Sequence, residues 1–141
     1  MKVHIAVVFV SVLVGVCAAH AQDTRSTAQG VFTEAQAKRG AAAYNANCAS
    51  CHGADLRSTD KEVTNLTGGP FKSGWVGKTI GERFEVVRET MPQREERSLA
   101  DDVYLDIITF ILWSNKVPAG SQELKPDLPA LKQIKIADPA G

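Results

Sequence analysis

The sequence has few cysteines, which form the disulfides of small domains, and few histidines, which are common metal ligands. Of its 141 residues, only three are cysteine and three are histidine. Three cysteines are too few for a disulfide scaffold, which needs an even and dense set. Lysine and arginine together number 16, as do aspartate and glutamate, so the formal net charge is +0. Without a positive excess, nucleic acid is not an expected partner.

The chain also lacks internal repeats and the alternating pattern of β-strands. Its composition is that of a globular protein, with 44% hydrophobic and 23% charged residues. A length of 141 residues corresponds to one domain. The periodic apolar segments have helical spacing, so we predict an all-α domain.

The first 21 residues have the three parts of a secretory signal peptide. Lys2 provides a positive start, residues 5–16 are apolar, and Ala19-His20-Ala21 is a small-x-small cleavage pattern. A retained membrane anchor is the alternative, but the apolar run is shorter than the about 20 residues of a membrane span. We therefore expect cleavage after Ala21, export to the periplasm and no membrane insertion of the mature chain.

Removal of this signal peptide leaves few side chains that could bind a metal or a redox group. Cys17 leaves with the signal, so Cys48 and Cys51 are the only thiols of the mature chain. His52 becomes its only histidine and Met91 its only methionine. A close cysteine pair in an oxidising compartment needs an explanation.

Capping signals and apolar spacing predict three main helices. We expect them at about residues 33–47, 79–91 and 98–114. Thr33, Thr79 and Ser98 each precede Gln, Glu or Asp by three positions, as in a capping box. Pro92 ends the second helix at Met91.

The remaining segments are predicted to be irregular. Residues 53–78 contain Gly68-Gly69-Pro70 and many small polar residues, so we expect a long ordered loop. Loops of this length are unusual in small domains unless they wrap something. Residues 22–32 are predicted to be a flexible arm and residues 125–141 an extended tail, which leaves 33–124 as the folded domain.

The segment Cys48-Ala49-Ser50-Cys51-His52 is the C-x-x-C-H attachment signature of c-type haem. Two thiols at this spacing can add to two vinyl groups on one edge of the porphyrin, and the next imidazole can reach the iron. A thioredoxin-like pair would need a strand–helix–strand pattern, and zinc would need a second ligand pair. A plain disulfide would leave His52 unexplained. We predict one haem c, attached through Cys48 and Cys51, with His52 as the proximal iron ligand.

The second axial ligand is predicted by elimination. No second histidine remains, so Met91 at the end of a helix is the candidate. The alternatives are that Met91 only fills the core and that Lys72, Lys78 or an open, water-filled position completes the iron site. Ligation by histidine and methionine closes both axial positions and so favours electron transfer over oxygen chemistry. The other nitrogen of His52 is expected to donate to a carbonyl at about residues 63–66.

Four segments carry a resemblance to a known family. They read G-A-A-A-Y-N-A-N-C-A-S-C-H-G-A-D-L, L-T-G-G-P-F-K-S-G-W, R-E-T-M-P and D-I-I-T-F-I-L-W-S-N-K-V-P-A-G. Over residues 33–124 the chain resembles class I c-type cytochromes of the bacterial monohaem type. It is also similar to cytochrome modules of periplasmic quinoprotein alcohol dehydrogenases.

The resemblance implies that the first and last helices cross beside the haem, where Gly40 and Tyr44 face Ile107 and Phe110. Gly40 would let two helix backbones approach; read otherwise, it only weakens its helix by about 1 kcal/mol relative to alanine. The resemblance also places Trp75 near the haem propionates, with ordinary core packing as the alternative.

One segment departs from the family pattern. The family often has Pro-x-Leu-x-Gly after the haem motif, and the proline carbonyl accepts a hydrogen bond from the ligand histidine. Here the segment reads Thr64-Asn65-Leu66-Thr67-Gly68. The Thr64 carbonyl is able to accept in the same way, but without the stiffness of proline.

The expected function is one-electron transfer between redox proteins, such as a periplasmic quinoprotein dehydrogenase and a terminal oxidase or another cytochrome. No general base, nucleophile or substrate pocket is evident, so we expect no enzyme activity. One alternative is a cytochrome subunit of a quinoprotein dehydrogenase complex. Another is a haem sensor or peroxidase with an open iron site.

Overall fold

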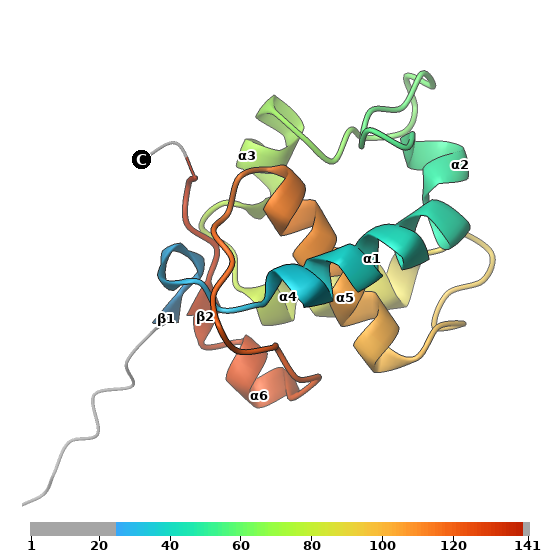
Figure 1. Cartoon of the computed structure of the whole chain (residues 1–141). Coiled ribbons are helices and arrows are strands. Elements are labelled where there is room, and N and C mark those ends of the chain that lie inside the picture. Colours follow the sequence, from blue (N-terminus) through green and yellow to red (C-terminus); the bar gives the residue numbers. More distant parts are fainter. Residues whose placement is uncertain (1–24, 140–141) are drawn as a thin grey trace, which may run out of the picture.

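The structure, a computed structural model of the chain, describes residues 25–139 (Figure 1). The predicted signal peptide at residues 1–21 lies outside the described residues. The described part is mainly helical, with a single two-stranded sheet, which confirms the all-α class. None of the helices within residues 25–139 has the length and hydrophobicity of a membrane span.

The helices and strands follow one another in a simple order. They are β1 (Arg25–Ser26), the short 3₁₀ helix η1 (Thr27–Gln29), α1 (Glu34–Asn47), α2 (Ala49–His52), α3 (Gly69–Trp75), α4 (Ile80–Thr90), α5 (Asp101–Ser114), α6 (Leu128–Leu131) and β2 (Ile134–Lys135). The three longest helices, α1, α4 and α5, are the three that the sequence predicts.

Two of the three predicted helix starts are confirmed. The Thr33 hydroxyl accepts from the Gln36 N–H at 3.0 Å, and the Thr79 hydroxyl accepts from the Glu82 N–H at 3.1 Å. The prediction that Ser98 opens the third helix is wrong, because α5 begins at Asp101 and has no side-chain cap. The Ser98 N–H instead donates to a carbonyl in the turn that precedes α5.

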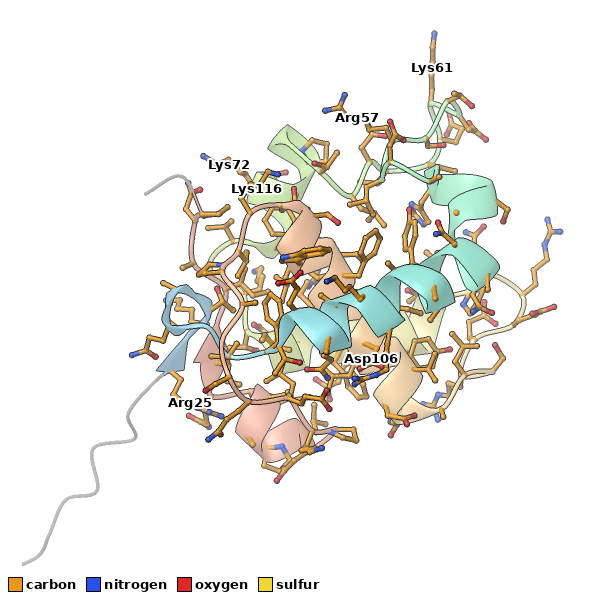
Figure 2. The ribbon with its side chains drawn as sticks, in the orientation of Figure 1. Arg25, Arg57, Lys61, Lys72, Asp106 and Lys116 are labelled. Carbon is orange, nitrogen blue, oxygen red and sulfur yellow. The ribbon has the colours of Figure 1, made fainter. Side chains whose placement is uncertain are left out.

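Helices α1 and α5 cross in direct contact (Figure 1). At the crossing, a Cβ atom added to Gly40 would lie 1.8 Å from the carbonyl oxygen of Asp106. The close helix approach expected at Gly40 is therefore confirmed. Beside it, the carboxylate of Asp106, which Figure 2 labels, pairs with the Arg39 guanidinium at 3.0 Å. The rings of Tyr44 and Phe110 are tilted to each other with centroids 5.1 Å apart, so these residues meet across the two helices as the resemblance implies.

Helix α5 is buried on more than one side, as its wide apolar face predicts. Its fully or almost fully buried apolar residues are Tyr104, Leu105, Ile107, Ile108, Ile111 and Leu112. Helices α1 and α4 pack against it, while α6 and β2 pack against α4. Helix α5 is thus the centre of the hydrophobic core.

The prediction of a loop throughout residues 53–78 is wrong at α3. Pro70 lies in the first turn of this helix, where its missing N–H has no intrahelical partner to lose. Phe71 and Trp75 are one turn apart and buried, with ring centroids 5.7 Å apart. With glycine at two of seven positions, α3 has weak intrinsic propensity. Burial of its two aromatic rings therefore stabilises α3 and offsets its weak helix propensity.

The predicted flexible arm and extended tail are instead paired with each other within the described residues. Strand β1 runs parallel to β2, with Arg25 opposite Ile134. Thr27 is fully buried, and its hydroxyl accepts from the Ala137 N–H at 3.0 Å. The folded unit therefore extends beyond the boundaries 33–124. Contacts between segments so far apart in the chain leave no local signal in the sequence.

The two ends also contribute apolar side chains to the core. Phe32, Leu131, Ile134 and Ile136 are buried almost completely. Full burial of one such side chain is worth about 1.5–3 kcal/mol. The arm and tail are therefore part of the stable fold.

Candidate haem site

The C-x-x-C-H motif occupies the junction of α1 and the one-turn helix α2. The Cys48 N–H donates to the Tyr44 carbonyl at 2.8 Å, and the Cys48 carbonyl accepts from the His52 N–H at 3.0 Å. Gly53 ends α2 with a φ of +78°, and a Cβ there would lie 2.0 Å from the Arg57 carbonyl oxygen. The motif is therefore held in one tight turn that only glycine closes without strain.

The two cysteines are free thiols in this turn. Cys51 is exposed, and Cys48 is partly buried. Burial, with a smaller contribution from nearby Cys51, raises the pKa of Cys48 to about 11. Disulfide oxidoreductases do the reverse and lower the pKa of their reactive thiol. The raised pKa of Cys48 therefore does not support a thioredoxin-like redox function for the cysteine pair.

The imidazole of His52 is oriented by one backbone contact. Its Nδ1 atom lies 3.1 Å from the carbonyl oxygen of Thr64. A carbonyl only accepts hydrogen bonds, so this contact assigns the proton to Nδ1 and leaves the lone pair of Nε2 free. Metal-binding histidines use this arrangement. Thr64 lies in the segment predicted for the acceptor, at the position where the resemblance expects proline.

The loop that carries this acceptor is tied to its neighbours by side chains. The Ser58 hydroxyl donates to the Cys51 carbonyl at 2.8 Å, and the Ser58 N–H donates to the Asn65 side chain at 2.8 Å. From α5, the Asn115 amide donates to the Leu66 carbonyl at 2.9 Å. These contacts hold the acceptor in place without the proline that the family often has.

Met91 lies at the point where the chain leaves α4. Its backbone is extended, with φ −133° and ψ 150°, while its N–H still donates to the Val87 carbonyl at 2.9 Å. The Tyr104 hydroxyl on α5 donates to the Met91 carbonyl at 2.8 Å. Met91 is only partly buried, so its thioether is not enclosed in the core. The sequence does not single out Tyr104, because its role depends on how α5 packs against the end of α4.

The lysines considered as alternative ligands lie at the surface. Lys72 on α3 pairs with Asp138 at 2.8 Å, and Figure 2 shows its side chain at the edge of the molecule. Lys78 is exposed. An ammonium group in an ion pair must lose both its partner and a proton before it binds iron. The structure thus favours neither lysine as a ligand.

Trp75 packs in the hydrophobic core, and an arginine lies over its ring. The residue is 6% exposed, and its ring stacks on Phe71. The guanidinium of Arg83 lies over it, 5.8 Å from the ring centroid. Among the described residues, the Arg83 Nε is the one buried side-chain donor or acceptor without a partner. Such an unpaired buried donor costs about 1–3 kcal/mol.

The residues present fit a haem c group. Its vinyl groups need two thiols, its iron needs axial ligands, and its two propionates need cationic or hydrogen-bonding partners. The chain supplies the cysteine pair, an imidazole with a free nitrogen, a thioether where the chain leaves α4, and an arginine whose Nε has no partner among the described residues. Partly buried apolar side chains on the same elements and on α5 pack against the core: Ala43, Leu66, Val87, Leu99, Val103 and Phe110.

The sequence does not single out Arg83 either, although a weak signal is present. Arg83 lies three residues after Ile80 and four before Val87, inside the apolar stripe of α4. A cation at such a position needs an anion or a polar neighbour to offset its burial. Sequence alone does not reveal which residue or group would supply it.

Comparison with known proteins agrees with this site. An all-α domain with a C-x-x-C-H turn and an oriented histidine has the features of a c-type cytochrome. The family model described as "Cytochrome C oxidase, cbb3-type, subunit III" matches residues 35–111, from the first turn of α1 to near the end of α5. Because the match covers more than half of the chain, the protein belongs to this c-type cytochrome family. No curated protein and no solved structure matches it significantly. Membership identifies the domain as one that uses haem for electron transfer.

Proposed function

We propose that this protein is a one-electron carrier and not an enzyme. One haem c would be attached through Cys48 and Cys51, with His52 and Met91 as axial ligands. The observation that carries the proposal is the 3.1 Å contact from His52 Nδ1 to the Thr64 carbonyl, which leaves Nε2 available to iron. The cysteine pair lies in the same turn as this imidazole, where both thiols could add to the haem vinyl groups.

The bound haem would supply a reversible one-electron change at iron. Two contacts within this chain position the proposed ligands. The Thr64 carbonyl orients the ring of His52, and the Tyr104 hydroxyl donates to the backbone carbonyl of Met91. If His52 and Met91 both bound the iron, they would leave no position on it for a substrate. Electron transfer then depends on the edge of the haem and on the surface around it.

The proposed location is the periplasm. The positive start, the apolar run and the Ala19-His20-Ala21 pattern support export, with cleavage after Ala21. Covalent attachment suits a compartment where a dissociated haem would be lost by dilution. Mass spectrometry of the exported protein tests this: a mature chain that begins at Gln22 supports it, and a retained N-terminus contradicts it.

The haem assignment is tested by spectroscopy of the mature protein, produced together with a haem-attachment system. We expect a low-spin c-type visible spectrum, a near-infrared sulfur–iron band, and pigment that stays with the polypeptide in acid–acetone. A colourless protein, or pigment that extracts into the solvent, contradicts covalent attachment. A spectrum without the sulfur–iron band contradicts Met91 as a ligand and leaves attachment standing.

A second candidate function is that of a cytochrome subunit within a larger redox complex. The matching family is described as a subunit of an oxidase, and the sequence resembles cytochrome modules of quinoprotein dehydrogenases. Purification from native membranes and periplasm discriminates between the two. Co-elution with a dehydrogenase or an oxidase supports the subunit, whereas a free monomer that shuttles electrons between two added partners supports the carrier.

A further inference from the structure

Ser58, in the loop between α2 and α3 (Figure 1), joins the two segments that meet in the contact between His52 and Thr64. Its hydroxyl donates at 2.8 Å to the carbonyl of Cys51, the residue before His52. Its N–H donates at 2.8 Å to the side-chain oxygen of Asn65, the residue after Thr64. Ser58 is therefore bonded to the immediate neighbour of each residue in the contact that orients the imidazole.

The hydroxyl of Ser58 has a defined direction in this arrangement. The Asp60 N–H donates to the same oxygen at 3.1 Å, so the oxygen accepts from Asp60. The hydroxyl proton is then available to the Cys51 carbonyl, which only accepts hydrogen bonds. Ser58 is also partly buried, so water has limited access to its side chain. These bonds fix the position of Ser58 relative to the turn that contains His52.

The other bonds to the acceptor segment hold that segment from one side. The Leu66 N–H donates to the Leu56 carbonyl at 2.9 Å, and the Leu66 carbonyl accepts from the Asn115 amide at 2.9 Å. Neither bond involves a residue of the C-x-x-C-H turn. Thr64 itself is exposed, so water competes for its carbonyl unless the two segments are held together. Ser58 differs from the other partners because it bonds to both segments.

We infer that Ser58 is a positioning residue that sets the strength of the hydrogen bond from His52 to Thr64 and, through it, the redox equilibrium of the haem iron. The inference rests on the proposed function. A hydrogen bond donated by Nδ1 raises the basicity of a metal-binding imidazole. A more basic ligand favours oxidised iron, which carries one more positive charge, and such hydrogen bonds are one means by which a protein sets a haem potential. Loosening this bond should therefore favour the reduced state.

The test is a redox titration of the mature holoprotein with Ser58→Ala, compared with Ser73→Ala. Ser73 is an exposed serine of α3 whose hydroxyl also donates to a carbonyl, that of Pro70 at 3.3 Å, so it controls for the loss of such a bond. At a fixed ambient potential near the midpoint, Ser58→Ala should lower the ratio of oxidised to reduced protein about threefold, or about 28 mV for one electron. Ser73→Ala should leave the ratio unchanged. Ser58→Thr, which keeps a hydroxyl, should restore the wild-type ratio.

A second measurement reports on the hydrogen bond directly. Exchange of the His52 Nδ1 proton with solvent can be followed by NMR of the reduced holoprotein, and it should be faster in Ser58→Ala than in wild type or Ser73→Ala. A serine that only stabilised the fold would lower the free energy of unfolding without changing the redox ratio. The ratio and the exchange rate together therefore separate positioning from simple stabilisation.

The inference is overturned if Ser58→Ala has the wild-type ratio, or if Ser58→Thr shifts the ratio as much as Ser58→Ala. If Ser58→Ala does not accumulate as holoprotein, Asn65→Ala decides instead, because it removes the acceptor of the Ser58 N–H and leaves the hydroxyl in place. A lower ratio in Asn65→Ala supports the inference, and an unchanged ratio overturns it. A wild type without covalent haem overturns the proposed function as well, whereas intact haem spectra with unchanged ratios overturn this inference alone.

Discussion

The side-chain amide of Gln36 forms two hydrogen bonds with the backbone of one distant residue, Leu124. It donates to the Leu124 carbonyl at 3.1 Å and accepts from the Leu124 N–H at 2.9 Å, and both bonds are buried. The side chain of Gln36 thus pairs with the backbone of Leu124 as a neighbouring β-strand would. It joins the first turn of α1 to the segment that leads into α6. The sequence predicts Gln36 only as a member of a capping box, so its larger role is tertiary.

Gln36→Leu should lower the free energy of unfolding of the holoprotein by at least about 2 kcal/mol, because it leaves two buried backbone groups of Leu124 without partners. Chemical denaturation followed by far-UV circular dichroism measures the change. Gln122→Leu, at an exposed position in the same C-terminal segment, is the control and should stay within about 0.5 kcal/mol of wild type. Equal effects of the two substitutions would show that the paired hydrogen bonds do not matter.

Gly40→Ala and Gly74→Ala should change stability in opposite directions. The added methyl at Gly40 would lie 1.8 Å from the Asp106 carbonyl oxygen, so α1 and α5 must separate, and we expect a loss of about 1–3 kcal/mol. Gly74 is also helical but has open space around the added atom, so alanine should gain about 0.5–1 kcal/mol there. Thermal unfolding of both holoproteins measures the pair. A neutral Gly40→Ala would contradict the close contact.

The cap of α4 should make stability depend on pH. The Thr79 N–H, and then the Thr79 hydroxyl, donate to the Glu82 carboxylate and lower its pKa below the ordinary value of 4.5. A carboxyl whose folded pKa is lowered stabilises the protein above its ordinary pKa, and this contribution is lost as the pH falls through the folded value. The stability gap between wild type and Glu82→Gln should therefore shrink as the pH is lowered through this window. We would measure the free energy of unfolding of both proteins at several acidic pH values. A difference between them that does not change with pH would contradict a stabilising role of the Glu82 carboxylate in the cap.

Met91→Ala should open the iron to small ligands. In the reduced state, we expect the variant to bind carbon monoxide readily and to lose the sulfur–iron band, while its covalent haem remains. The wild type should bind carbon monoxide slowly or not at all. Rapid binding by the wild type would instead support the open-site sensor or peroxidase reading. Flash photolysis and absorbance spectroscopy distinguish these outcomes.

Features encoded within a few residues could be read from the sequence. The C-x-x-C-H turn, the Thr33 and Thr79 caps and the end of α4 at Met91 depend on neighbours at most four positions away. Helix α3 could not be read in this way, since its stability comes from burying Phe71 and Trp75. The spacing predicted Ser98 as a helix cap, but its N–H donates to the Glu95 carbonyl in the turn before α5.

The sequence by itself determined the chemistry of the site: one cysteine pair, one histidine and one methionine in the predicted mature chain, each beside a local signal that positions it. Only the tertiary structure decided what surrounds them. It brought β1 against β2, Gln36 against Leu124, and Arg83 over Trp75 without an anion. The physical reason is range, because caps and turns are set by bonds between near neighbours, while pairing and burial depend on segments that meet only when the whole chain has folded.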